Sequence, residues 1–184
     1  MNDTRDLTTY SASKLAELIR SNVASSEEVV KAHISRIKKV NPRLNAVVVL
    51  TEKSALKSAR EADSLTQNSK SLPPLHGVPI TIKDAFEVAG VVSTGGTLGR
   101  KDYVPDKDAI AVKRLKQAGA IILGKTNLPE ISMGFESSNL VYGKANNPFD
   151  IERTPGGSSG GEASIIAAGG SPFGIGSDAG GSIR

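Results

Sequence analysis

Three segments of this 184-residue chain carry side chains that could take part in a reaction. Lys83 ends the apolar stretch Gly77-Val-Pro-Ile-Thr-Ile-Lys83 and is followed by an acidic residue. Ser158 lies in Gly156-Gly-Ser-Ser-Gly-Gly161, and Ser182 lies in Asp178-Ala-Gly-Gly-Ser-Ile-Arg184. A serine hydroxyl becomes a nucleophile when a base takes its proton, and a lysine can be that base when it is neutral.

Lys83 is useful as a base only if its pKa falls. A free lysine has a pKa near 10.4, so at pH 7 only about four molecules in ten thousand are neutral. Burial disfavours the ammonium and lowers the pKa toward the range in which a general base works. The stretch before Lys83 is apolar enough to be a central strand, although a lysine at a strand end is more often a solvated surface residue. We therefore predict that Lys83 is largely buried.

Glycine is concentrated around the two serines. Ten of the 19 glycines fall between Gly156 and Gly181, a density that indicates a need for particular backbone geometry. Residues 156–161 have the composition of a flexible linker. However, residues 162–168 are expected to form a short apolar helix ended by two glycines, so the run leads into a helix N-terminus. This context favours a packed loop whose free N–H groups attract negative charge.

Two nucleotide-binding interpretations of these glycines are weak. A phosphate-binding loop requires Gly-Lys-Ser/Thr, and no lysine follows Gly161 in that position. Residues 174–179 match the Gly-x-Gly-x-x-Ala dinucleotide pattern, but a lone match has little weight and Pro172 lies just before it. We expect no cofactor.

In order and spacing, the three segments resemble the amidase signature family of serine hydrolases, which act on carboxamides. Lys83 precedes Ser158 by 75 residues, and Ser158 precedes Ser182 by 24 residues. The resemblance runs from about Leu7 to Arg184 and includes residues 124–127 and 147–150. It implies an α/β fold, the amidase signature fold, in which helices flank a mixed central β-sheet.

The resemblance also implies a Ser–Ser–Lys triad. In it, Ser182 is the nucleophile, Ser158 is a bridging serine preceded by a cis peptide bond, and Lys83 is the base. Ser158 can accept the proton of Ser182 while it donates its own proton to neutral Lys83. The same relay can later run in reverse and protonate the leaving amine.

The run that ends at the nucleophile is expected to form an oxyanion hole from consecutive backbone N–H groups, those of Ala179, Gly180, Gly181 and Ser182. Glycine permits the turn that points these groups at one atom. The two flanking charges, Asp178 and Arg184, are expected to hold the turn and take no part in the reaction.

The elements that must position these residues begin with a helical layer over residues 1–70. A first helix is expected after Ser11 or Ser13. A second helix starts at a capping box formed by Ser25 and Glu28 and is expected to stop at Asn41-Pro42. A short strand over residues 46–50 and a third helix over residues 51–64 follow.

Residues 71–184 are expected to form the catalytic α/β part. Residues 77–83 and 120–123 are strand candidates, and a helix between them should begin at Asp106 or Asp108 and end at Ala118. No internal repeat is visible, so we predict one domain.

Composition excludes several other classes of protein. The chain is 38% hydrophobic and 23% charged, as in an ordinary globular domain. It contains no cysteine and two histidines, so thiol chemistry is excluded and a metal site is not expected. The net charge of +4 comes from the first 70 residues, and aromatic content is 4% without tryptophan, so direct nucleic-acid binding is not expected. No signal peptide or membrane span is apparent, and we expect a cytoplasmic protein, for which a homodimer is conceivable.

Three functional hypotheses follow from the sequence. The first is an amidase that converts a small-molecule carboxamide to an acid and ammonia or an amine through an acyl-enzyme on Ser182. The second is the A subunit of the glutamyl-tRNA(Gln) amidotransferase. The family resemblance implies that this subunit uses the same triad to release ammonia from glutamine inside a complex. Glu162 and Ala179 look more like the stand-alone amidases. The third, from another class, is a non-catalytic module in which the glycine loops bind an anion.

Members of this family continue for several hundred residues beyond the signature. We therefore expect residues 1–184 to be the N-terminal part of a single amidase signature domain with an incomplete sheet. Unpaired strand edges and apolar faces would then be exposed. On this expectation, the chain alone has little amidase activity and tends to aggregate.

Overall fold

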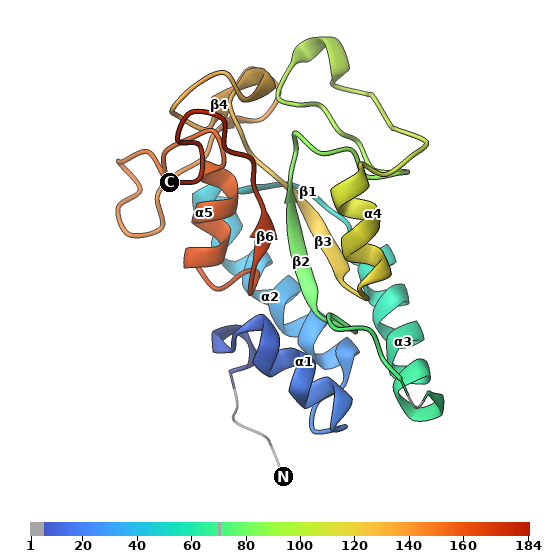
Figure 1. The fold of residues 1–184 in the computed structure, drawn as a ribbon. Helices are drawn as coiled ribbons and strands as arrows, with labels where there is room; N and C mark the ends of the chain where they lie inside the picture. The colour runs from blue at the N-terminus through green and yellow to red at the C-terminus, as the bar shows by residue number, and fades with distance from the viewer. Residues whose placement is uncertain (1–5, 70) are drawn as a thin grey trace.

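The computed structural model describes residues 6–69 and 71–184, so residues 1–5 and 70 of the expected helical layer lie outside the described residues. A four-stranded mixed sheet lies at the centre, with helices on both sides (Figure 1). The strand order is β1 (Val47–Leu50), β3 (Ile121–Thr126), β2 (Pro79–Lys83) and β6 (Gly174–Ile175). The expected α/β class with a mixed central sheet is confirmed.

Strand directions bring the carboxyl ends of three strands to one edge of this sheet. β1 is antiparallel to β3, whereas β2 runs parallel to both β3 and β6. In open sheets of this kind, ligands bind just outside the carboxyl ends of the parallel strands. The loops that follow Lys83, Thr126 and Ile175 therefore occupy the place where a site is expected.

Helices cover both faces of the sheet. On one face, α2 (Ser26–Leu44), α3 (Glu52–Asn68) and α5 (Gly160–Ala167) pack on β1 and β3. On the other face, α4 (Ile110–Gln117) packs on β2. α1 (Ala12–Arg20) forms a third apolar cluster with α2 near the start of β2. The buried side chains of these clusters supply the apolar surroundings that a depressed lysine pKa requires.

Side chains alternate between the two faces of β2, and this alternation positions Lys83. Ile80 and Ile82 belong to the apolar cluster beneath α4. Thr81 and Lys83 therefore point to the opposite face, on the side of α5. All five residues of β2 are buried, as expected for a central strand.

The start signals of the first two helices are confirmed. The Ser11 side chain accepts a hydrogen bond from the Lys14 N–H at the start of α1. At the start of α2, both halves of the Ser25–Glu28 capping box are formed. Each contact satisfies a backbone N–H group that has no partner within the helix.

The expected stop of the second helix at Asn41-Pro42 is wrong. α2 continues through Pro42 and ends at Leu44, and the C-cap residue Asn45 adopts the left-handed conformation with φ 45° and ψ 38°. In the last turn a proline costs one helical hydrogen bond, and the Asn41 side chain stabilises the exit by accepting from the N–H groups of Ala46 and Val47.

Two further helix boundaries differ from the prediction. α3 reaches Asn68, four residues beyond the expected end. α4 begins at Ile110 after Ala109, and Asp108 does not cap it. The Asp108 carboxylate instead accepts from the Ala89 N–H at 2.8 Å and from Lys116 Nζ at 2.7 Å. These contacts join segments far apart in the sequence, so local cap patterns did not reveal them.

The remaining short elements lie in the connecting loops. β4 (Ser138–Asn139) and β5 (Gly143–Lys144) form a two-stranded hairpin. Three 3-10 turns cover Leu7–Thr9, Leu98–Arg100 and Glu130–Ser132. Among helices formed by the described residues, none has the length and apolar character needed to cross a bilayer.

Candidate active site

Lys83 and Ser158 meet at the carboxyl end of β2. The Lys83 side chain is 0% exposed, which confirms the prediction that it is buried. Its Nζ lies 2.5 Å from Ser158 Oγ, within hydrogen-bond distance. The structure thus brings together two residues that the sequence separates by 75 positions and that the proton relay requires side by side.

The loop that carries Ser158 is packed, as the sequence predicted, and is not a linker. Its Gly157–Ser158 peptide bond is cis, as the family resemblance implied. A Cβ at Gly157 would come within 2.8 Å of the Glu136 nitrogen and of the Phe135 carbonyl carbon, so only glycine fits there. The Gly160 N–H donates to Ser137 Oγ at 2.9 Å, which fixes the start of α5.

The surroundings of Lys83 change its acid–base chemistry in the direction that a base requires. Burial lowers its pKa to about 8, and the nearby carboxylates of Asp178 and Glu162 oppose this shift. At pH 7, roughly a tenth of such lysines are neutral, compared with about four in ten thousand free lysines. Lys83 can therefore accept a proton near neutral pH.

Ser177 is a second hydroxyl partner of Lys83 that the sequence reasoning missed. Lys83 Nζ donates to Ser177 Oγ at 2.8 Å. Ser177 closely follows β6, and β6 pairs with β2, so the parallel register brings it to the lysine. The only sequence signal was its position inside the signature segment.

Ser182 lies beside the bridging serine through its backbone. Its carbonyl oxygen accepts from the Ser159 N–H at 3.1 Å, and its side chain is half-buried. Among residues 6–69 and 71–184, the Ser182 hydroxyl has no hydrogen-bond partner, so its bond to Ser158 stays a prediction. Hydrogen bonds between catalytic groups often tighten only when substrate is bound.

The four N–H groups nominated as an oxyanion hole are not equivalent. The Gly181 N–H donates to Asp178 Oδ1 at 2.7 Å. Within the described chain, the N–H groups of Ala179, Gly180 and Ser182 donate to no protein group. These three remain free for a developing oxyanion, and the oxyanion hole itself stays a prediction.

Asp178 and Arg184 hold this turn, as the sequence reasoning expected. The Asp178 carboxylate accepts from the N–H groups of Ile183 and Arg184 and from the Arg184 guanidinium. These hydrogen bonds, above all that of Arg184, keep the pKa of Asp178 well below its usual range. The charged pair therefore fixes the loop on which Ser182 lies.

A second buried lysine supports the neighbouring loop. Lys125 Nζ lies 2.5 Å from Asp84 Oδ1 and 2.8 Å from Ser93 Oγ. The other Asp84 oxygen accepts from the N–H groups of Thr94 and Gly95. Asp84 follows Lys83, which contacts Ser158, and Lys125 precedes Thr126, which contacts Glu162. Asp84 and Lys125 therefore point to the other face of the sheet. The pair anchors the loop after β2 to the end of β3.

The segments at residues 155–166 and 174–184 line a cleft of about 480 Å³, and the lining residues include Gly157, Ser159, Gly176 and Ser182. A hollow of about 570 Å³ between α3 and α4 is larger, but Lys83, Ser158 and Ser182 do not line it. In the described part of the chain, no three His, Asp or Glu side chains form a group that could hold a metal ion.

Comparison with known sequences links this geometry to enzymes that act on amides. The Amidase family model matches residues 28–184. Fatty-acid amide hydrolase 2-A of Danio rerio is 48% identical over 188 residues, covering 98% of this chain and 35% of that protein. The A subunit of the glutamyl-tRNA(Gln) amidotransferase of Salinispora tropica is 42% identical over 179 residues, covering 97% of this chain and 35% of that protein. The chain spans about a third of the length of these curated relatives.

Solved structures of amide-hydrolysing enzymes are also similar to this chain. A fatty acid amide hydrolase structure matches with a TM-score of 0.92 and 35% identity, over 97% of this chain and 32% of that one. The native peptide amidase of Stenotrophomonas maltophilia matches with a TM-score of 0.83 and 33% identity, over 89% of this chain and 34% of that one. The fold is therefore shared with these enzymes.

Proposed function

Because the chain belongs to the amidase signature family, we propose that it carries the catalytic centre of an enzyme that hydrolyses a linear carboxamide to a carboxylic acid and ammonia or an amine. The observation that carries the proposal is the 2.5 Å contact between Lys83 Nζ and Ser158 Oγ in a buried site. A surface lysine would have no such partner and no lowered pKa. The other support comes from the match to the Amidase family over residues 28–184.

In the proposed acylation step, Ser182 Oγ attacks the carbonyl carbon of the amide. Its proton passes to Ser158 Oγ, which gives its own proton to neutral Lys83 Nζ. The negative charge that develops on the carbonyl oxygen faces free N–H groups in the run from Ala179 to Ser182. Lys83 then returns a proton through Ser158 to the leaving nitrogen, the C–N bond breaks, and an ester on Ser182 remains.

Deacylation uses the same groups with water in place of the serine. Water attacks the ester carbon, and its proton passes through Ser158 to Lys83. The relay returns a proton to Ser182 Oγ as the C–O bond breaks, and the acid leaves. No cofactor takes part in this proposal, since the serine, the relay and the backbone N–H groups supply nucleophile, base and anion stabilisation.

A serine-directed probe tests the proposal at its central atom. In the protein extended beyond Arg184, we expect a fluorophosphonate to form an adduct on Ser182 that mass spectrometry locates, and we expect no adduct in Ser182→Ala. Labelling of a different residue, or of none, would count against the enzyme. A non-catalytic anion-binding module is the outcome if Ser182→Ala retains ligand affinity and no serine reacts.

A second candidate within the family is the A subunit of the glutamyl-tRNA(Gln) amidotransferase. The 42% identity to the Salinispora tropica protein favours it. The glutamate at position 162 favours a stand-alone amidase. Release of ammonia from glutamine that appears only with a partner protein would decide for the amidotransferase, whereas hydrolysis of simple amides without a partner would decide for the amidase. A cytoplasmic location and a possible homodimer belong to the proposal and can be tested by cell fractionation and sedimentation.

A further inference from the structure

A buried carboxylate lies next to the proposed base and has no role in the Ser–Ser–Lys relay. Glu162 lies in the first turn of α5, and the residue is 4% exposed. Thr81 Oγ1 donates to Glu162 Oε2 at 2.7 Å, and Thr126 Oγ1 donates to Oε1 at 2.9 Å. Each carboxyl oxygen thus accepts a hydroxyl hydrogen bond, an arrangement that suits the ionised form.

The surrounding backbone leaves space for this carboxylate. Gly174 in β6 lies against it, and a Cβ at this position would overlap Glu162 Oε2 and come within 2.9 Å of Thr81 Oγ1. Three strands and one helix therefore build the pocket: β2 and β3 supply the hydroxyls, β6 supplies a residue without a side chain, and α5 supplies the acid. Such convergence indicates a built site, because a buried carboxylate without partners would be costly.

The register of the sheet places Glu162 on the same face as Lys83. Thr81 and Lys83 alternate with the isoleucines of β2, and Thr126 is the register partner of Lys83 on β3. Both threonines that bind Glu162 therefore lie next to the lysine, one along its strand and one across from it. The Glu162 carboxylate therefore lies on the same face of the sheet as the Lys83 side chain.

Two carboxylates, from different elements, act on Lys83. Glu162 acts on it from α5, and Asp178 acts on it from the loop after β6. Asp178 is already paired with the Arg184 guanidinium, and Asp84 is paired with Lys125 on the other face of the sheet. Glu162 makes no ion pair of its own among the described residues, and hydroxyls alone satisfy it. Its charge is therefore available to the lysine.

We propose that Glu162 is a positioning residue whose carboxylate is the counter-charge for the Lys83 ammonium that forms each time the relay delivers a proton. This inference rests on the proposed function. When Ser182 attacks, Lys83 changes from amine to ammonium in a buried place, where an isolated charge is unfavourable. A fixed carboxylate removes that isolation, and its hydrogen bonds go to Thr81 and Thr126, not to the serines. It therefore acts on the lysine through its charge.

Glu162 and Lys83 each shift the pKa of the other. Burial raises the pKa of Glu162 to about 7, and the threonine hydrogen bonds and Lys83 oppose that rise. In the opposite direction, Glu162 raises the pKa of Lys83. Replacing the carboxylate by a neutral amide therefore lowers the pKa of Lys83, because the ammonium loses an attractive charge.

The test measures the pKa of Lys83 directly, by the pH dependence of its 15N Nζ resonance in the 15N-lysine-labelled protein, assigned by its loss in Lys83→Arg. We expect Glu162→Gln to lower this pKa by about one pH unit, as removal of a neighbouring carboxylate does in a protein interior. Glu61→Gln, with the same charge change on the exposed face of α3, should leave it unchanged. Thr126→Val removes one hydroxyl donor, which disfavours the Glu162 carboxylate, and should lower the lysine pKa by a smaller amount.

The pH dependence of Ser182 labelling is a second test of the same inference. The rate of Ser182 labelling by a fluorophosphonate should rise with pH through the Lys83 pKa, and in Glu162→Gln this rise should move to lower pH by the same amount. A Lys83 pKa unchanged by Glu162→Gln overturns the inference, and a reduced stability alone would indicate a purely structural residue. If Glu162→Gln does not fold, Thr126→Val decides in the same way. Absence of labelling in the unmodified protein would contradict the proposed function, while the resonance still tests Glu162.

Discussion

At the scale of single residues, Lys83 shows how position changes chemical character. The same side chain on a surface would be an ammonium at pH 7, with a pKa near 10.4. At the end of a buried strand, loss of hydration lowers that pKa to about 8. Hydroxyls of Ser158 and Ser177 then orient the amine without adding charge. Lys83 can accept a proton near neutral pH because burial removes its hydration and its two hydrogen-bond partners are neutral.

Ser158 should be distinguishable from the adjacent serine by its effect on labelling. We expect Ser158→Ala to slow fluorophosphonate labelling of Ser182 by about 100-fold or more, since the proton would lose its route to Lys83. Ser159→Ala is the matched control. The Ser159 hydroxyl donates to the Ser177 carbonyl at 3.1 Å and does not contact Lys83.

The comparison of these two variants separates a relay from a packing effect. A loss in Ser159→Ala that equals the loss in Ser158→Ala would mean that the loop merely needs both hydroxyls to keep its shape. A loss confined to Ser158→Ala, with circular dichroism unchanged, is the result that the relay predicts.

At the scale of elements, the site depends on how closely α5 approaches the sheet. Gly161 in the first turn of α5 lies against the end of β3, and its N–H donates to the Asn127 carbonyl at 3.1 Å. Glycine is required by this close approach, because a side chain would separate the helix from the strand. The approach brings Ser158 and Glu162, on either side of Gly161, to the lysine.

Gly161→Ala should therefore lower the free energy of unfolding. An added Cβ would lie 2.5 Å from the Asn127 carbonyl oxygen and 2.9 Å from that of Ala46. Overpacking of this kind costs about 1–3 kcal/mol. Gly99→Ala is the control, because the nearest atom to its Cβ would be Thr97 Oγ1 at 3.9 Å. Urea unfolding followed by circular dichroism measures both, and equal stabilities would contradict the close-approach explanation.

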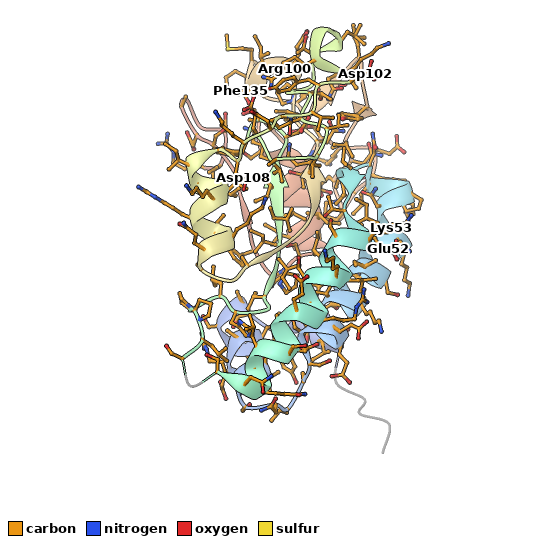
Figure 2. All side chains as sticks on the ribbon, turned by 90° about the vertical axis from the view of Figure 1, so that its right-hand side faces the viewer. Glu52, Lys53, Arg100, Asp102, Asp108 and Phe135 are labelled. Atoms are coloured by element: carbon orange, nitrogen blue, oxygen red, sulfur yellow. The ribbon has the colours of Figure 1, made fainter. Side chains whose placement is uncertain are left out.

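At the scale of the whole molecule, large apolar side chains lie exposed beyond the carboxyl ends of the strands. Phe135 is 78% exposed, and Ile131, Met133 and Leu140 in the same region are also exposed. Figure 2 shows Phe135 toward the same end of the molecule as Arg100 and Asp102, whereas Glu52 and Lys53 of α3 lie farther from that end. Neighbouring apolar side chains of this kind mark a surface that binds another molecule or promotes association.

We expect the chain to self-associate through this surface at high concentration. Phe135→Ser should weaken association by about tenfold or more, since burial of a phenylalanine contributes about 1.5–3 kcal/mol. Leu65→Ser is the control, because Leu65 is 56% exposed but lies on α3. Sedimentation velocity over a range of concentrations measures both variants. A chain that stays monomeric throughout, or an equal effect of the two substitutions, would contradict this expectation.

The sequence by itself determined the local parts of this protein. Helix starts at Ser11 and Ser25, the apolar strand before Lys83 and the glycine loop before α5 follow from interactions within a few residues. The order of Lys83, Ser158 and Ser182 identified the family, because the signature is read along the chain. Local hydrogen bonds and backbone preferences act over the same short distances as the patterns that reveal them.

Only the tertiary structure decided which distant groups meet. The contacts of Lys83 with Ser177, of Glu162 with two threonines and of Asp84 with Lys125 join residues 94, 81, 36 and 41 positions apart. They depend on strand order and on a register shift between β2 and β3, which no short segment encodes. The continuation of α2 through Pro42 has the same origin, since contacts at the helix exit outweighed a local preference. Local chemistry fixed the reacting groups, and packing of the sheet fixed the charges around them.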